Sequence, residues 1–331
     1  MANPAKLRVL SSADVWRALP MTEAIVAMKE AFRELSAGKA VVPPRTRICI
    51  EERLGDVLVM PAFSPAAGRI GLKVITLFER NRTLRLPFIQ ALALVLDAGT
   101  GTPMAIMDGT ALTAIRTGAA SGAATDLLAR SNVRKVAIFG AGLQARTQLE
   151  AVLTVRPLVE AAVFDPEHIR ADEFAAWAGR EFGIAASAAA SPAEALEGAG
   201  VVCTATTSQT PVFADAELAS GVHINAVGSY QPGVREIPPE TVVRALVFVD
   251  HYGAAWEEAG DLVLPLEAGL ITRGHVQAEL GEVASGDKPG RQDPCAVTLF
   301  KSVGLAVQDL AAAARALANA EALGLGTSVT L

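Results

Sequence analysis

A glycine-rich turn between an apolar run and a helix-forming run constrains the fold of this chain most. The run at 135–139 ends at Gly140-Ala141-Gly142, and residues 143–153 then favour a helix. A strand that turns this tightly into a helix aims the amino terminus of the helix at a pyrophosphate. Gly140 permits the turn, and Gly142 lets the backbone approach the phosphates because it has no Cβ. These features predict a Rossmann-type dinucleotide site.

An acidic residue after the next apolar run supports this prediction. Residues 161–164 form a second short apolar segment, and Asp165 follows it, about 25 residues after Gly140. A carboxylate there can accept hydrogen bonds from both ribose hydroxyls and repels a 2′-phosphate, so that it favours NAD over NADP. Arg170 can contact a 2′-phosphate if the loop curls back, so the use of NADP stays open. The alternative for Asp165 is a turn or capping residue before Pro166.

Composition and charge exclude several classes of protein. The chain has 331 residues, of which 51% are hydrophobic, and its formal net charge is −6. This length accommodates one large or two medium domains. The mild acidity, without a basic cluster, argues against nucleic acid as a partner. We expect no membrane span, because no run of about 18 apolar residues is free of charge, and no secretory signal at the amino terminus.

The cysteines and histidines indicate neither a disulfide framework nor a metal site. The cysteines are odd in number and far apart, which suits a protein of the reducing cytoplasm; they are Cys49, Cys203 and Cys295. The histidines lack the spacing that is typical of metal ligands; they are His168, His223, His251 and His275. We therefore expect a cytoplasmic protein with no zinc or iron.

The part of the chain before residue 130 is typical of an antiparallel sheet with at least one helix against it. A helical period over 13–37 comes first, with a helix start expected at Met21-Thr22 and a stop at Gly38. A helix rich in small residues is expected over 110–129. A turn signal at 97–102 predicts a hairpin. Strand-like runs, punctuated by glycine and proline, are expected at 46–51, 56–61, 71–77, 91–97 and 104–107.

From residue 133 onward the chain alternates between strand and helix patterns, which is typical of a parallel sheet. Helices are expected at 143–153 and 172–182. A long, alanine-rich helix is expected over 294–323, packing back across the domain junction because no sheet follows it. The expected strands are 135–139, 161–164, 201–204, 222–227 and 246–249.

Three cationic residues in apolar or glycine-rich surroundings point to a second site. Arg45 follows two prolines, Lys73 lies within a strand-like run, and Arg116 lies among small residues. Lysine and arginine are almost never buried unpaired. A lysine with apolar neighbours on both sides therefore needs an anionic partner, or has a lowered pKa that is useful in catalysis. The alternative is that Lys73 faces solvent on a half-buried strand.

Several motifs of the chain are uncommon in other proteins and occur in a recognisable order. They lie at 44–46, 60–62, 71–74, 114–121, 140–145, 204–207, 224–228 and 299–309. In residues and order they resemble the ornithine cyclodeaminase/mu-crystallin family of NAD(P)-dependent proteins. The resemblance covers essentially the whole chain.

This resemblance implies a homodimer with an α/β fold. A Rossmann NAD(P)-binding domain, residues 126–304, would be inserted into an α+β substrate-binding and dimerisation domain, residues 1–125 and 305–331. The substrate would be a small imino or amino acid whose α-carboxylate is held by cations. The expected substrate-binding residues are Arg45, Met60, Lys73, Arg116 and Tyr230. The expected cofactor-binding residues are Arg116, Thr117, Gly140, Ala141, Gly142, Leu143, Gln144, Asp165, Thr204, Ala205, Thr206, Val227, Gly228 and Ser302.

Two positions differ from the cyclodeaminases. Those enzymes have an aspartate after the Ala-Val-Gly segment, where this chain has Tyr230. They also have an acid two residues before the methionine of Met-Pro, where this chain has Leu58. A buried ammonium without either carboxylate costs several kcal/mol, so ornithine and lysine are disfavoured as substrates. Tyr230 either bounds the side-chain pocket or only packs.

We therefore predict an NAD(P)H-dependent reductase of cyclic ketimines such as Δ1-pyrroline-2-carboxylate. Lys73 is the expected catalytic residue, because a lysine beside the imine nitrogen can donate a proton or stabilise charge. The alternative is an amino-acid dehydrogenase that acts on alanine and uses free ammonia. A dinucleotide-binding protein without activity is the least favoured hypothesis, since a pure binder has no need of Lys73.

Overall fold

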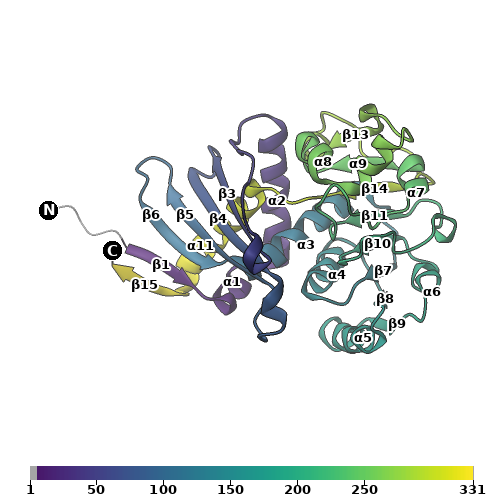
Figure 1. Ribbon diagram of the computed structural model, residues 1–331, viewed down its shortest axis with the longest axis horizontal. Coiled ribbons are helices and arrows are strands. Elements are labelled where there is room, and N and C mark those ends of the chain that lie inside the picture. Colours follow the sequence, from purple (N-terminus) through teal and green to yellow (C-terminus); the bar gives the residue numbers. More distant parts are fainter. Residues whose placement is uncertain (1–5, 331) are drawn as a thin grey trace. The chain divides into compact units, whose positions relative to one another are not determined.

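The computed structural model describes residues 6–330, which form two compact units. One unit runs to Arg116 and resumes at Leu305, and the other spans Thr117–Gly304. The first boundary lies within helix α3 (Gly109–Leu128), which occupies the place where the sequence predicts a helix of small residues. Figure 1 shows the sheet of each unit together with its helices.

The first unit is built on a seven-stranded sheet with the order β15-β1-β6-β5-β4-β3-β2. Its neighbouring strands are antiparallel, except that β1 and β6 are parallel. The five strands expected before residue 130 are confirmed, whereas the sequence analysis missed β1 and β15. The bounds are β1 Lys6–Leu10, β2 Thr46–Ile50, β3 Gly55–Ser64, β4 Arg69–Phe78, β5 Ile89–Asp97, β6 Pro103–Asp108 and β15 Thr327–Thr330.

The helical period over 13–37 is divided between two helices, and the helix start expected at Met21-Thr22 is confirmed. Helix α1 spans Ser12–Ala18, and helix α2 spans Met21–Ser36. Pro20 lies between them, and Leu19 before it has a ψ of 75°. A proline disfavours the helical conformation of the residue before it, so the backbone helix is interrupted at Leu19 although the apolar pattern of the sequence continues.

The long helix expected over 294–323 is wrong in its first part. Helix α11 begins at Ala306 and ends at Leu323, and Thr298–Lys301 forms strand β14 of the second unit. Gly304 separates the two elements with a φ of +80°, which does not continue a right-handed helix. Helix α11 packs on β3, β4 and β5 and beside α1 and α2, so the last helix completes the core of the first unit.

The second unit is a doubly wound sheet with the order β13-β12-β14-β11-β10-β7-β8-β9, and all its strand pairs are parallel. This arrangement confirms the predicted α/β fold with a Rossmann dinucleotide-binding topology. The sequence analysis missed β9, β13 and β14. The bounds are β7 Lys135–Phe139, β8 Glu160–Phe164, β9 Ala185–Ala188, β10 Val201–Thr204, β11 His223–Ala226, β12 Leu246–Val249, β13 Val276–Glu279 and β14 Thr298–Lys301.

Strand β7 is buried on both faces, as parallel strands between two helix layers are. Val136 and Ile138 belong to one apolar cluster, and Ala137 and Phe139 belong to another. The α-helices of this unit that follow α3 are α4 Leu143–Val155, α5 His168–Phe182, α6 Pro192–Leu196, α7 Pro239–Arg244, α8 Tyr252–Glu258, α9 Gly260–Glu267 and α10 Leu280–Ser285. Short 3₁₀ turns lie at Glu51–Arg53, Glu79–Arg82, Asp215–Glu217 and Arg273–His275.

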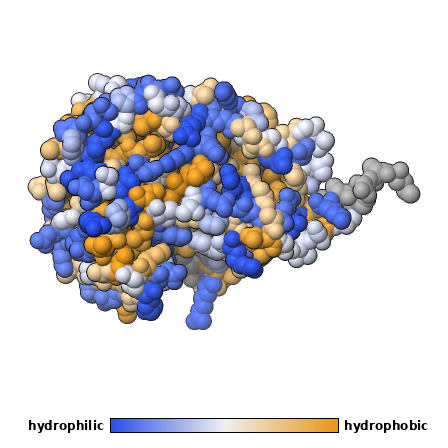
Figure 2. Space-filling model, turned by 180° about the vertical axis from the view of Figure 1, so that it is seen from behind, coloured by the Kyte–Doolittle hydropathy of each residue, from blue (hydrophilic) through white to orange (hydrophobic). Residues whose placement is uncertain are grey.

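The surface carries a mixture of residue types. On the face seen in Figure 2, hydrophobic residues are interspersed with hydrophilic ones. Within residues 6–330, none of the helices combines the length and the apolar character that a membrane crossing needs.

Candidate active site

The glycine turn after β7 has the geometry that a phosphate site needs. Gly140 has a φ of +93°, and a Cβ at this residue would lie 2.7 Å from the carbonyl oxygen of Ala205. A Cβ at Gly142 would meet only the Arg170 guanidinium, at 3.9 Å, so the backbone is open to a ligand there. In the first turn of α4, Oε1 of Gln144 is buried, and no group within residues 6–330 donates a hydrogen bond to it. The turn and the amino terminus of α4 therefore fit a dinucleotide.

Asp165 lies at the end of β8 and braces this turn. Its Oδ2 accepts a hydrogen bond from the Ala141 N–H at 2.9 Å, and its Oδ1 accepts one from the Glu167 N–H at 3.0 Å. A carboxylate offers about four acceptor sites, so these two bonds still leave room for ribose hydroxyls. Nη1 of Arg170, in the first turn of α5, lies 3.8 Å from Oδ2, so the guanidinium lies beside Asp165.

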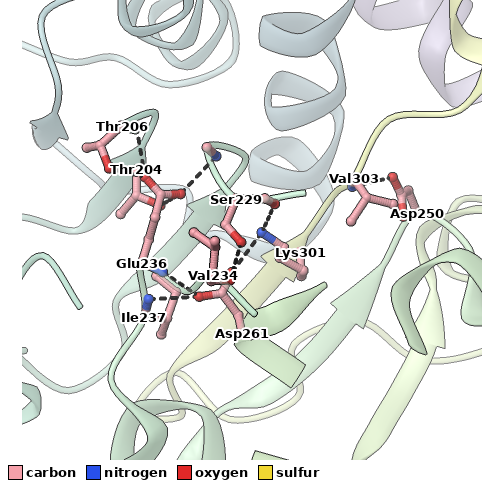
Figure 3. A network of polar contacts seen from close by, with 11 residues as sticks. Thr204, Thr206, Ser229, Val234, Glu236, Ile237, Asp250, Asp261, Lys301 and Val303 are labelled. Atoms are coloured by element: carbon pink, nitrogen blue, oxygen red, sulfur yellow. Dashed lines mark hydrogen bonds and ion pairs between the residues drawn. The ribbon is translucent and has the colours of Figure 1, made fainter. Parts of the chain in front are cut away.

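Three of the residues expected to bind the cofactor lie at the carboxyl ends of neighbouring strands. Thr204 ends β10, Gly228 lies just beyond β11, and Ser302 follows β14 directly. Their polar groups are held by two buried carboxylates: Glu236 accepts hydrogen bonds from Thr204 (Figure 3) and from Gly228, and Asp250 accepts one from Ser302 at 2.8 Å. Neither acid was expected from the sequence, because both lie far along the chain from most of the groups they hold.

Other residues expected near the cofactor have structural contacts of their own. The Val227 N–H donates to the Thr204 carbonyl at 3.1 Å. The Thr117 carbonyl, on α3, accepts a hydrogen bond from Nε2 of Gln148 at 3.3 Å. Leu143 at the start of α4 is 47% exposed. Val227 therefore lies at the carboxyl edge of the sheet, Leu143 opens α4, and Thr117 joins α3 to the middle of α4.

In the first unit, the structure brings two of the three predicted cations together around one carboxylate. Nζ of Lys73, on β4, lies 2.7 Å from Oδ2 of Asp309, on α11. Nε of Arg116 lies 3.0 Å from Oδ1 of the same residue, and its Nη1 donates to Gln308 at 2.9 Å. Lys73 is 2% exposed, so the solvent-facing alternative for this residue is wrong. Met60 pairs with Lys73 across β3 and β4.

The charges of this cluster shift the pKa values of its members. Burial lowers the pKa of Lys73 from 10.5 to about 8, and Arg116 and Arg45 lower it further against the opposing effect of Asp309. Burial by itself raises the pKa of Asp309, but Lys73 and Arg116 outweigh it and hold that pKa below its usual value. Arg45 is partly buried. The cluster has more positive than negative charge, which suits an anionic ligand.

The two positions that differ from the cyclodeaminases have unlike environments. Leu58 on β3 is buried in an apolar cluster with Ala306 and Leu310 of α11. A carboxylate at this position would be buried against these apolar side chains. Tyr230 lies in the loop after β11 and is 37% exposed.

Comparison with known proteins gives full-length matches. The model of the ornithine cyclodeaminase/mu-crystallin family matches residues 6–322. The Δ1-pyrroline-2-carboxylate reductase of Bacillus cereus is 37% identical over 322 residues, which are 97% of this chain and 99% of that protein.

Two solved structures are similar over nearly their whole length. The Δ1-pyrroline-2-carboxylate reductase of Thermococcus litoralis, in complex with NADH and L-proline, is 40% identical with a TM-score of 0.93, covering 97% of this chain and 100% of that one. An archaeal alanine dehydrogenase dimer with bound NAD is 35% identical with a TM-score of 0.91, and the match covers 98% of this chain and 99% of that one.

Proposed function

The chain belongs to the ornithine cyclodeaminase/mu-crystallin family, and from this premise we propose that it is an NAD(P)H-dependent reductase of cyclic imino acids. Its substrates are ketimines such as Δ1-pyrroline-2-carboxylate, which hydride transfer converts to proline. The observation that carries this proposal is the buried cluster of Lys73 and Arg116 around Asp309. Two relatives with the same full-length match are reductases of this imine.

The cationic cluster holds and activates the substrate. Arg45 and Arg116 bind the α-carboxylate; the guanidinium of Arg116 has five N–H donors, of which Asp309 and Gln308 engage two. Lys73 donates a proton to the imine nitrogen, which makes the imine carbon a better hydride acceptor. A pKa of about 8 keeps Lys73 charged at neutral pH and still lets it give up its proton.

The second unit holds the cofactor. We assign the pyrophosphate to Gly140, Ala141 and Gly142 with the first turn of α4, and the ribose hydroxyls to Asp165. The residues at the ends of β10, β11 and β14 line the nicotinamide side. When bound, the dinucleotide supplies the hydride. NAD is the proposed cofactor, and the Arg170 guanidinium provides a counter-charge through which NADP is also admitted.

We also propose a homodimer in the cytoplasm. The sheet of the first unit exposes two apolar side chains that the strand register places on one face, Ile48 on β2 and Leu92 on β5. Exposed apolar groups on a sheet are typical of an association surface, and the archaeal alanine dehydrogenase is a dimer. Cys49 and Cys295 are exposed free thiols, which is compatible with a reducing compartment. Light scattering at micromolar concentration tests the dimer.

The second candidate function is an amino-acid dehydrogenase that uses pyruvate and ammonia. It is favoured by the similarity to the archaeal alanine dehydrogenase, and the same cations would bind the carboxylate of a keto acid. Ornithine cyclodeaminase is disfavoured, because Leu58 lies in an apolar cluster and Tyr230 replaces the other acid. A binding protein without activity is least favoured, since burying Lys73 has no use in it.

One assay separates these functions. NADH and NADPH oxidation is followed with Δ1-pyrroline-2-carboxylate, with Δ1-piperideine-2-carboxylate, and with pyruvate plus ammonia. Turnover of a cyclic imine supports the reductase. Activity only with pyruvate and ammonia makes the protein an amino-acid dehydrogenase, and binding of the dinucleotide without turnover on any of the three supports the binding protein.

A further inference from the structure

One buried carboxylate joins the ends of two neighbouring strands in the second unit (Figure 3). Glu236 is fully buried. Its Oε1 accepts hydrogen bonds from the N–H and the hydroxyl of Thr206, at 2.8 and 2.7 Å. Its Oε2 accepts from the Thr204 hydroxyl at 2.9 Å and from the Gly228 N–H at 2.8 Å. The side chain therefore ties the loop after β10 to the loop after β11.

A buried ion pair fixes the segment that carries Glu236. Oδ1 of Asp261 accepts hydrogen bonds from the N–H groups of Glu236 and Ile237, at 2.7 and 2.9 Å. Its Oδ2 lies 2.7 Å from Nζ of Lys301, which also donates to the Ser229 carbonyl at 2.6 Å. Lys301 and Asp261 have no exposed surface. Figure 3 shows these groups as one continuous network.

The loop that Glu236 holds lies directly against the dinucleotide turn. Ala205, between its two threonine partners, has the carbonyl oxygen that a Cβ at Gly140 would approach to 2.7 Å. A Cβ at Gly228 would lie 2.4 Å from Oε1 of Glu236 and 2.5 Å from the Thr206 carbonyl oxygen. A shift of this carboxylate would therefore move the backbone on both sides of the cofactor site.

We propose that Glu236 is a positioning residue that sets the wall for the nicotinamide half of the dinucleotide. In doubly wound sheets the ligand lies outside the carboxyl ends of the strands, near the switch point. Strand β7 supplies the phosphate turn, and β10 and β11 follow it in the sheet order. This inference rests on the proposed function for the identity of the cofactor, although it does not depend on the imine.

The network requires a carboxylate at position 236 and not merely a polar group. Each oxygen of Glu236 faces one peptide N–H, from Thr206 on Oε1 and from Gly228 on Oε2. A hydroxyl can rotate to accept a hydrogen bond, but a peptide N–H cannot. In Glu236→Gln the side-chain NH₂ therefore faces a peptide N–H in either orientation, and one buried donor loses its acceptor.

The test compares two ligands on Glu236→Gln by fluorescence and calorimetric titration. NADH contains the nicotinamide, and ADP-ribose lacks it. We expect the Kd of NADH to rise about tenfold to a hundredfold, while the Kd of ADP-ribose stays within about threefold of the wild type. The matched control is Glu282→Gln, whose carboxylate accepts from Tyr252 and the Glu279 N–H beside β13; it should leave both Kd values unchanged.

Two results would overturn the proposal. An unchanged Kd of NADH would show that the carboxylate is dispensable, and an equal loss for both ligands would show a general structural role. If Glu236→Gln does not fold, Thr204→Val is the second variant, because it removes only one hydroxyl donor. It should raise the Kd of NADH a few fold and leave the Kd of ADP-ribose unchanged. Wild-type binding of NADH without reduction of any imine would contradict the proposed function and leave this binding test intact.

Discussion

Replacing Lys73 by methionine should separate activity from stability. Nζ of Lys73 is 2.7 Å from Asp309, and the side chain is 2% exposed. Methionine has a similar length and no charge, so Lys73→Met removes the proposed proton donor without opening a large cavity. Asp309 keeps its bond to Nε of Arg116 at 3.0 Å, so the carboxylate is not left unpaired.

The size of the effect on stability follows from the pKa of Lys73. Folding lowers this pKa from 10.5 to about 8. A difference of about 2.5 corresponds to roughly 3 kcal/mol at about 1.4 kcal/mol for each pKa unit. This free energy is the loss of folding stability caused by burying a charged Lys73. Because the folded-state pKa lies below the unfolded one, the loss is complete below pH 8. It disappears as the pH rises from about 8 to 10.5.

The variant should therefore be as stable as the wild type at pH 7, or more stable by up to roughly 3 kcal/mol. The difference in the free energy of unfolding between variant and wild type should become smaller when urea unfolding is repeated near pH 10. Imine reduction at pH 7 should fall by about 10²- to 10⁴-fold, the usual contribution of a general acid. In the wild type, kcat/KM for the imine should decline above pH 8 as Lys73 loses its proton.

The control is Arg69→Met on the same strand. Arg69 pairs with Asp97 at 3.3 Å, and its side chain is 30% exposed, so this variant should leave the rate unchanged. Unimpaired imine reduction by Lys73→Met would refute the role as proton donor. A loss of more than about 2 kcal/mol of stability would refute the electrostatic reasoning, because the ion pair would then outweigh the cost of burial.

Three further predictions concern other parts of the two sites. Arg170→Ala should lower kcat/KM for NADPH about tenfold relative to NADH, because the guanidinium beside Asp165 is the proposed partner of a 2′-phosphate; steady-state kinetics with both cofactors measures it. Gly140→Ala should weaken NADH binding in fluorescence titrations at least tenfold, because it combines a φ of +93° with a 2.7 Å contact. Asp309→Asn should cost about 3–5 kcal/mol in urea unfolding, because it leaves two buried cations without their carboxylate.

The structural features that could be predicted are those set by residues close together in the sequence. The turn at Gly140 could be predicted because it needs glycine at fixed places between a strand and a helix. Burial of Lys73 was one of the two alternatives that its apolar neighbours allowed, and a buried Lys73 called for either an anionic partner or a lowered pKa. The identity of that partner could not be derived, because Asp309 lies 193 residues from Arg116 along the chain.

The buried acids of the second unit escaped prediction for a similar reason. Glu236 lies 32 residues from Thr204, and nothing in its own surroundings in the sequence marks it as buried. Its partners are backbone N–H groups and hydroxyls, which leave no pattern of residue types. The error in the start of α11 has another cause: the alanine-rich run begins only at Ala306, whereas the prediction extended the helix back over Thr298–Lys301, which pairs with β11 and β12 in the sheet.

The return of the chain to the first unit at Leu305 has a consequence during synthesis. Arg116 leaves the ribosome 193 residues before Asp309 does. At about 5–20 residues per second, this interval lasts on the order of 10–40 seconds. During this interval Asp309 is not yet present to neutralise Lys73 and Arg116. Helix α11 is also not yet present to pack on β3, β4 and β5. The inserted unit is translated completely before Asp309 is, so the cationic cluster can assemble only after the whole inserted unit has been synthesised.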